Sequence, residues 1–461
     1  MTAPMQDLIV VLPGILGSTL AKDGQLIWAP SAGAVLRAIA TLGQNIGAMA
    51  LPEGIGDEHP GDGVQPVGLM PDLHVLPGLW SANIGYDALL DWLRSRFHLI
   101  EAPQDDPDRF ANLLPIPYDW RLSNRYNGRR LKSIVEPALE KWRSQHSTFE
   151  DAKVVFICHS MGGLVARWYI DREGGAEITR KLITLGTPHR GALNALEQLV
   201  NGAQVGLGPF SLKLTPFARS LPSLYQLLPE YACIELPGGL AKTTETQVPE
   251  LATAMIEDAM RFHAELDAAQ AHGYDLHPIV GFRQPTKTTA RVDRGRVVPV
   301  YTIKGNDEGG DGTVPRLAAT PVGLRPDHPT VRSAADRHGA LQSNGSVLDE
   351  LEFVLGARSE PYRVSGQGEL SVTVEELLLS GESLVLSATP VDGSRTRLRA
   401  TVNNEAGHEV TSVLLEPARP VTIDPLPPSG YTVTVGAVGT AATRVAPVTC
   451  PILVWDTEEN R

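Results

Sequence analysis

The sequence is poor in cysteine. Its 461 residues include only Cys158, Cys233 and Cys450. Three widely separated cysteines do not make a disulfide framework and do not have the spacing of zinc ligands. The acidic segment "NDEGGDG" also lacks the regular carboxylate spacing of a calcium-binding loop. We therefore expect no metal site and no cofactor.

An excess of positive charge is also missing, because the formal net charge is −13 at pH 7. Binding to nucleic acid without sequence preference needs a basic surface that displaces counterions from the phosphates. We expect no nucleic-acid partner.

Long hydrophobic runs are absent as well. No stretch approaches the roughly 18 consecutive apolar residues that a membrane-spanning helix needs. The N-terminal segment "MTAPMQDLIVVLPG" has no basic start, and its apolar run begins at Leu8 and is broken by Pro13 and Gly14. A secretory signal peptide is therefore not expected, and the predicted location is the cytoplasm.

Short apolar runs alternate with helical patterns through the first part of the chain. The segment "DLIVVLPG" predicts a buried strand, because it is short, rich in Ile and Val, and closed by Pro-Gly. Similar runs are "LLPIPYDW" (113–120), "KVVFIC" (153–158) and "KLITLGTP" (181–188), and amphipathic patterns such as "YDALLDWLRSRF" and "LKSIVEPALEKWRSQ" lie between them. This alternation predicts an α/β fold with a parallel sheet covered by helices on both faces.

Two stretches exceed what a minimal sheet needs. Residues 25–77 are rich in Ala, Gly and Pro, and residues 195–275 have mostly helical patterns. We interpret both as insertions, which either add packing or form a cap or lid over a site.

The pattern changes after "LDELEFVLGA" (348–357), the predicted last helix of this domain. The segments "LSVTV", "SLVLSAT", "RLRATV", "EVTSVLL", "VTI", "GYTVTVGA" and "ILVW" are short β-type runs separated by turn signals. They predict an immunoglobulin-like β-sandwich, although the Cys…Trp…Cys signature is missing. The predicted domains are thus 1–357 and 368–461, joined by a linker at 358–367.

Ser160 lies where a predicted strand becomes a predicted helix, in "VVFICHSMGGLVARWYI". A nucleophilic serine on a sharp strand-to-helix turn needs small residues two positions before and two after it. Gly162 meets this requirement, and Cys158 replaces the usual glycine at the other position. Ser160 is the candidate nucleophile; its alternative role is a polar residue at an ordinary turn.

A serine nucleophile needs a base that is oriented by an acid, and in this fold both follow the serine in the order acid, then His. Asp311 lies in the glycine-rich loop "NDEGGDGTVP", after the predicted strand "RVVPVYTIKG". Asp307 and Glu308 are rivals that we interpret as solvated loop charges.

His338 is the candidate base, because it lies in a loop just before the predicted last helix. His328 lies near prolines in "RPDHPT" and is expected to face solvent. His159 and His189 come too early in the chain order.

Backbone amides would form the oxyanion hole. Met161, directly after the serine, is one candidate donor, and Ile15 in "LPGILGS" is the second. Leu79 in "HVLPGLWS" is an alternative to Ile15.

With these residues in view, the chain resembles the lecithin:cholesterol acyltransferase-like branch of the α/β-hydrolase lipases. The resemblance covers about residues 5–356 and rests on "VVLPGILGSTL", "IPYDWRLS", "CHSMGGLVARW", "LGTPHRG" and "GGDGTVP" followed by "RHGALQSN". It implies a Ser160–Asp311–His338 triad, a lipid-like acyl ester substrate and a mobile lid. The C-terminal sandwich is not part of the family core, so a cholesterol substrate is not implied.

The leading functional hypothesis is a serine hydrolase that cleaves carboxylic esters through an acyl-enzyme on Ser160. The alternatives are an O-acyltransferase that uses the same intermediate, and an inactive scaffold whose sandwich binds a protein partner. A lipid substrate would also bring the cap insertions into contact with a membrane surface. The sequence does not identify substrate-binding residues.

Overall fold

The computed structural model describes residues 2–29, 49–72, 85–102, 109–202, 204–205, 212–268, 273–356, 368–442 and 445–455. The predicted linker 358–367, Leu79 and parts of the 25–77 insertion lie outside these residues.

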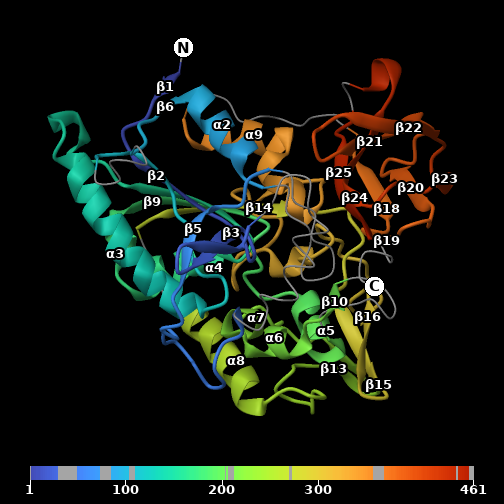
Figure 1. Ribbon diagram of the computed structural model, residues 1–461, viewed down its shortest axis with the longest axis horizontal. Helices are drawn as coiled ribbons and strands as arrows, with labels where there is room; N and C mark the ends of the chain where they lie inside the picture. The colour runs from blue at the N-terminus through green and yellow to red at the C-terminus, as the bar shows by residue number, and fades with distance from the viewer. Residues whose placement is uncertain are drawn as a thin grey trace.

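Among the described residues, six parallel strands form the central sheet (Figure 1). Their order is β17-β14-β9-β8-β2-β7, and each neighbouring pair is parallel. The strands are β2 (Leu8–Leu12), β7 (Leu113–Pro115), β8 (Val154–His159), β9 (Thr179–Leu185), β14 (Asp275–Gly281) and β17 (Arg332–Ala334). The four strands that were predicted from apolar runs are present, and β14 and β17 are additional.

One predicted strand belongs elsewhere. The segment "RVVPVYTIKG" contributes β16 (Arg296–Val300), which pairs with β15 (Thr289–Asp293) in a separate four-stranded sheet of order β13-β12-β15-β16. Its remaining strands are β12 (Ile234–Leu236) and β13 (Gly239–Ala241). The segment is thus a strand before the Asp311 loop, as predicted, but the preceding strand of the central sheet is β14.

Helices cover both faces of the central sheet, as predicted. In β2, Leu8, Val10 and Leu12 belong to one apolar cluster, whereas Ile9 and Val11 belong to another, because successive side chains of a strand point to opposite faces. The first cluster includes residues of α3 (Asn124–Arg143) and α4 (Gly162–Arg172), and the second includes residues of α2 (Asp87–Arg96) and α9 (Gly345–Val354). This arrangement is that of an α/β-hydrolase.

Helix α3 illustrates how local sequence fixes an element. The Ser123 side chain accepts a hydrogen bond from the Tyr126 amide at 3.0 Å and caps the helix start. Its buried apolar residues recur at helical spacing, at Leu131, Val135 and Leu139. The helix starts earlier than its apolar pattern indicated, because capping by Ser123 defines the first turn.

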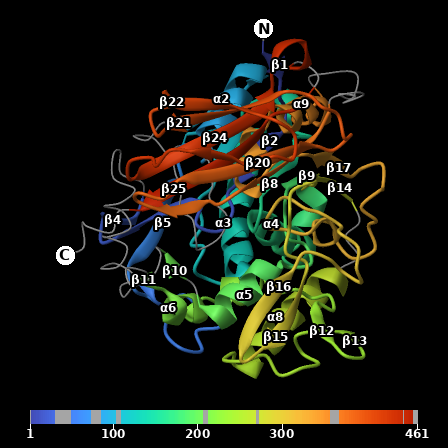
Figure 2. The same ribbon diagram turned by 90° about the vertical axis from the view of Figure 1, so that its right-hand side faces the viewer.

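The two predicted insertions contain most of the remaining elements of the larger domain. Residues 195–275 hold helices that gather on one side of the sheet in both views (Figures 1 and 2). These helices are α5 (Leu193–Asn201), α6 (Thr215–Ser220), α7 (Pro222–Tyr225) and α8 (Thr253–Ala268). The described parts of 25–77 include β4 (Gln25–Trp28) and β5 (Val64–Leu69), which both pair with β3 (Ser18–Lys22). None of the described helices is long and apolar enough to cross a bilayer.

The C-terminal part is a β-sandwich with its own apolar core (Figure 2). One sheet has the order β18-β20-β23, and the other β19-β25-β24-β21-β22. The strands are β18 (Leu370–Val374), β19 (Leu377–Leu379), β20 (Leu384–Pro390), β21 (Leu398–Asn404), β22 (Glu409–Leu415), β23 (Val421–Ile423), β24 (Ser429–Ala437) and β25 (Val448–Trp455). All seven predicted runs contain strands, and among the described residues 368–442 and 445–455 the strand β19 was not predicted. The immunoglobulin-like type and the domain limits stay predictions.

Candidate active site

Ser160 lies on a strained turn between β8 and α4. Its φ is +51°, a left-handed value that is uncommon for any residue other than glycine. The Ser160 amide donates to the Leu185 carbonyl at 2.9 Å, which ties the turn to the end of β9. The turn therefore holds the serine at the carboxyl edge of the sheet, where parallel α/β sheets bind ligands.

Two positions beside the serine explain how strand and helix approach each other. A Cβ added to Gly162 would lie 2.4 Å from the Pro13 carbonyl oxygen, so only glycine fits there. Cys158 is fully buried in the apolar cluster around α4, and burial raises the pKa of its thiol. Cys158 is thus a packing residue where a glycine was expected, and not a rival nucleophile.

The structure brings the three predicted catalytic residues together. His338 Nε2 lies 2.8 Å from Ser160 Oγ, and His338 Nδ1 lies 2.7 Å from Asp311 Oδ2. Asp311 Oδ1 accepts hydrogen bonds from the amides of Thr313 at 2.9 Å and Val314 at 2.7 Å. The carboxylate therefore fixes the imidazole with Nδ1–H toward Asp311, which leaves Nε2 free to accept the serine proton.

All three side chains are shielded from solvent, with 2% of Ser160 and 1% each of Asp311 and His338 exposed. Ser160 directly follows β8 and His338 follows β17, whereas Asp311 lies against the end of β14. A Cβ added to Gly281 would lie 2.3 Å from the Asp311 Cβ, so the last residue of β14 packs directly against the acid. Burial in this setting strengthens each electrostatic contact between them.

The rival residues do not join this group. Asp307 and Glu308 are exposed, and Asp307 caps its own turn by accepting from the Gly309 amide. His328 is also exposed. His189 is buried elsewhere, with Nε2 3.2 Å from Thr184 Oγ1.

His159 is not the base, but it lies in the site, which sequence reasoning missed. Its Nε2 lies 3.0 Å from the His338 carbonyl oxygen, and its Nδ1 lies 2.8 Å from the Tyr86 hydroxyl. Burial, together with the neighbouring His338, lowers the pKa of His159 to about 3, so its ring is neutral. Nε2–H therefore donates to His338, and Nδ1 accepts from Tyr86.

Tyr86 extends this chain of contacts to the loop after β2. Its hydroxyl oxygen accepts a hydrogen bond from the Gly14 amide at 2.7 Å. The position of Tyr86, at the start of α2, gave no sequence signal of this role. Together, Tyr86 and His159 connect the Gly14 turn to the backbone of the histidine loop.

The predicted oxyanion donors lie next to the serine, because Met161 directly follows it and Ile15 follows Gly14, which packs against it. The turn at 14–17 is closed by a hydrogen bond from the Gly17 amide to the Gly14 carbonyl at 3.0 Å, and a Cβ on Gly14 would lie 2.9 Å from the Ser160 Cβ. In the part of the chain that the structure describes, neither the Ile15 nor the Met161 amide has a hydrogen-bond partner. Both are free to donate to a ligand. The alternative donor Leu79 lies outside the described residues.

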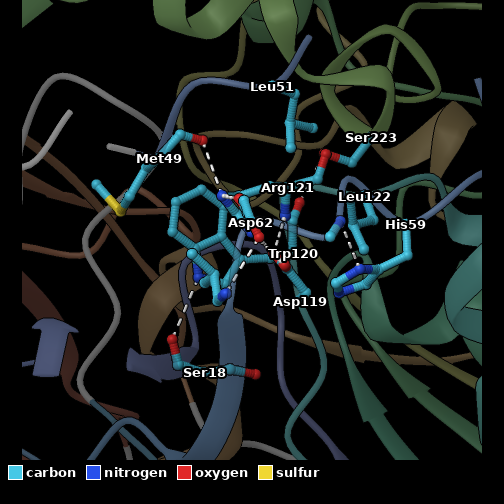
Figure 3. A network of polar contacts seen from close by, with 12 residues as sticks. Ser18, Met49, Leu51, His59, Asp62, Asp119, Trp120, Arg121, Leu122 and Ser223 are labelled. Carbon is cyan, nitrogen blue, oxygen red and sulfur yellow. Dashed lines mark hydrogen bonds and ion pairs between the residues drawn. The ribbon is translucent and has the colours of Figure 1, made fainter. Parts of the chain in front are cut away.

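The segment Tyr118–Arg121 forms a buried network beside the site (Figure 3). Arg121 pairs with Asp119 at 2.7 Å and with Asp62 at 2.8 Å, and it donates to the Met49 carbonyl at 3.0 Å. The Tyr118 hydroxyl donates to the Pro13 carbonyl at 2.9 Å. These contacts support a structural role that connects the 49–62 segment to the loop after β2.

The same region carries two further contacts. Trp120 Nε1 donates to the Ser18 carbonyl at 3.2 Å, and Ser223 Oγ donates to the Trp120 carbonyl at 2.6 Å (Figure 3).

Among the described residues, no group of three or more His, Cys, Asp or Glu side chains comes close enough together to hold a metal ion.

Part of the chain matches the model of a known protein family. The family model for lecithin:cholesterol acyltransferase matches residues 108–281, a region that includes Ser160 and ends before Asp311 and His338. No curated protein sequence matches the chain.

Among solved structures, the propeptide form of the Bacillus licheniformis lipase BlEst2 is similar with 10% identity and a TM-score of 0.37, over 98% of this chain and 95% of the lipase chain. The mature form of the same lipase has 12% identity and a TM-score of 0.37, over 77% of this chain and 94% of that chain. At these identities and TM-scores the likeness does not define the fold, which the strand order of the central sheet and its helices define. Over residues 108–281, which include the Ser160 turn, the chain is similar to the lecithin:cholesterol acyltransferase family, and its central sheet has the arrangement of an α/β-hydrolase.

Proposed function

We propose that this protein is a serine esterase of the lipase type that forms an acyl-enzyme on Ser160. The observation that carries the proposal is the pair of contacts made by His338, 2.8 Å from Ser160 Oγ and 2.7 Å from Asp311 Oδ2. A neutral imidazole between a serine hydroxyl and a buried carboxylate is the arrangement that activates a serine for attack.

The proposed reaction has two steps. His338 Nε2 accepts the Oγ proton as Ser160 attacks the ester carbonyl, while Asp311 stabilises the imidazolium that forms. The free amides of Ile15 and Met161 donate to the oxyanion, and His338 then gives its proton to the leaving alcohol. Water, deprotonated by the same imidazole, attacks the acyl carbonyl; the bond to Ser160 Oγ then breaks, and the imidazolium returns the proton to Oγ as the free acid leaves.

The test is labelling of the purified protein with a fluorophosphonate probe. Wild-type protein should be labelled, Ser160→Ala should not, and the control Ser147→Ala, which changes an exposed serine, should be labelled like wild type. A series of p-nitrophenyl esters then defines the acyl-chain preference. A folded wild-type protein that neither reacts with the probe nor hydrolyses any ester of the series would sink the proposal and favour the inactive scaffold.

The family match to an acyltransferase supports one alternative fate of the acyl-enzyme, transfer to an alcohol. The acceptor would take the place of water in the second step. Adding a long-chain alcohol to the ester assay separates the two fates, because transfer gives more new ester than free acid, whereas hydrolysis gives the reverse.

A lipid-like substrate also leads us to propose contact with a membrane surface through the 25–77 insertion, where Leu26 and Val67 are 62% and 53% exposed. Flotation with anionic or neutral vesicles tests this contact, and Leu26→Ser should weaken it. The proposed cytoplasmic location is tested by cell fractionation.

A further inference from the structure

The β-sandwich contacts the loop that carries His338. Arg337, directly before the histidine, donates from Nη2 to the Val372 carbonyl in β18 at 2.8 Å and pairs through Nη1 with Glu376 at 3.1 Å. Asp336, one residue earlier, accepts from the Thr449 amide in β25 at 3.0 Å. The two residues before His338 therefore make hydrogen bonds to two strands of the sandwich, β18 and β25, and an ion pair to Glu376, which follows β18.

The sandwich is also connected, through Gln284, to the loop that carries Asp311. The Gln284 amide donates to the Gly310 carbonyl, directly before the acid, at 3.0 Å. The Gln284 side chain donates to the Leu370 carbonyl at 3.0 Å and accepts from the Val372 amide at 3.3 Å, so it extends the edge of β18. Gln284 thus connects the acid loop to the same strand that holds Arg337.

The two loops also meet each other at this interface. A Cβ added to Gly312 would lie 3.2 Å from Arg337 Nη1, so the guanidinium packs against the residue after the acid. Arg337 therefore lies between the Asp311 loop and β18. A shift of the sandwich would move Arg337 and, with it, the loops that carry Asp311 and His338.

Apolar packing makes the contact continuous. In β25, Leu453 and Trp455 belong to the core of the larger domain, whereas Ile452 and Val454 belong to the core of the sandwich. One strand therefore contributes a face to each core. Domains that share such a buried apolar surface do not move independently, unlike domains joined by a polar interface.

We propose that the sandwich is a positioning element of the proposed catalytic site, and that Arg337 and Gln284 are its positioning residues. This inference rests on the proposed serine-esterase function. The contacts hold the acid and base loops at the spacing that the Asp311–His338 hydrogen bond requires. Small displacements of such groups are costly, because a misplacement of about 1 Å lowers a rate by about 100-fold.

The experiment compares full-length variants at the interface. Arg337→Met removes both polar contacts of the guanidinium, and Arg337→Lys keeps the charge but cannot make both contacts at once. The control is Glu369→Gln, which breaks the ion pair with Arg283 across the same interface at 3.1 Å without touching either loop. Each variant is assayed for kcat and KM on a short water-soluble ester and for its rate of fluorophosphonate labelling.

We expect kcat and the labelling rate of Arg337→Met to fall by about 10- to 100-fold with KM unchanged, Arg337→Lys to be intermediate, and the control to stay within about twofold of wild type. The downfield proton resonance of the Asp311–His338 hydrogen bond should shift in the same order, which a change in stability alone would not produce. If Arg337→Met does not fold, Arg337→Lys and the milder Glu376→Gln decide the question.

Two results would overturn the inference. If the variants keep the kcat of wild type, the sandwich only stabilises the protein and does not position the loops. If their kcat exceeds that of wild type, contacts with the sandwich hinder the reaction instead of supporting it. In either case wild type is active, so the proposed function stands. A wild-type protein that neither labels nor turns over ester would instead remove the proposed function, and this inference with it.

Discussion

Tyr86→Phe tests the contacts that link the Gly14 turn to the histidine loop. The change keeps the ring and removes only the hydroxyl, which accepts from the Gly14 amide at 2.7 Å and lies 2.8 Å from His159 Nδ1. Both partners are buried, so each loses its hydrogen bond without gaining one from water. Leaving a buried polar group unsatisfied costs about 1–3 kcal/mol, so we expect a loss of about 2–6 kcal/mol in the free energy of unfolding.

The same change should lower the proposed activity. Ile15 follows Gly14 in the turn, so a shift of the Gly14 amide moves the proposed oxyanion donor. Complete loss of one such donor lowers kcat by about 100- to 1,000-fold. A turn that is displaced but still present should lower kcat by less than this. We expect a fall in kcat of about 10- to 100-fold with KM nearly unchanged.

The assay combines urea unfolding with steady-state hydrolysis of a p-nitrophenyl ester. Tyr225→Phe is the matched control, because it removes a buried tyrosine hydroxyl that lies on α7 and outside this network. Wild-type kcat in Tyr86→Phe, together with a clear loss of stability, would refute the positioning argument. If Tyr86→Phe left the free energy of unfolding unchanged, the Gly14 amide and His159 Nδ1 could not be buried without hydrogen-bond partners in the variant.

Three further predictions concern other contacts. Gly281→Ala should lower kcat by at least about 10-fold and cost about 1–3 kcal/mol, because the new Cβ would lie 2.3 Å from the Asp311 Cβ; parallel ester assays and urea unfolding check this. Arg121→Met should cost about 3–5 kcal/mol, because it leaves Asp119 buried without its cation, but turnover per folded molecule should stay near that of wild type; a fall in turnover with unchanged stability would contradict the structural role. The pKa of His159 is about 3 in the folded protein, whereas a histidine in the unfolded chain binds a proton below about pH 6.5. Between these values each pH unit of acidification therefore lowers the free energy of unfolding by about 1.4 kcal/mol. In His159→Gln this contribution is absent, so the urea concentration at half-unfolding should fall less between pH 6.5 and pH 4.5 than in wild type.

Sequence patterns could predict strands whose side chains are continuously apolar. Every residue of β2 and β8 is buried, and their sequences, LIVVL and VVFICH, are continuously apolar except for the terminal His159. β14 was missed because Pro278 and two polar residues, Asp275 and His277, break its apolar run. β17 has three residues and starts with Arg332, which is too short a pattern to be noticed.

The sheet that a predicted strand joins has a related limit. The segment "RVVPVYTIKG" has the β-branched composition of a strand and contributes β16, but β16 pairs with β15 in the separate four-stranded sheet. Composition predicts whether a segment is extended and not which sheet it joins, because that depends on contacts with distant segments.

The candidate site was predictable where chain order and local turns define it. Ser160, Asp311 and His338 lie in loops with recognisable neighbours, so each could be proposed from its own segment. The Tyr86–His159 contact joins residues that are 73 positions apart, and neither segment carries a mark of the other. The docking of the sandwich was equally hidden, because strand patterns do not tell which face of a domain is covered.

The order of strands in the central sheet has a consequence for biosynthesis. After β2 and β7 pair, the strands β8, β9, β14 and β17 join the sheet on one side in the order in which the ribosome makes them. Ser160 is therefore synthesised after about a third of the 461 residues, whereas Asp311 comes later than β14 and His338 comes after β17. If the proposed function is right, a chain synthesised only as far as β14 has the proposed nucleophile without the proposed base, so it would not hydrolyse esters until synthesis has passed His338.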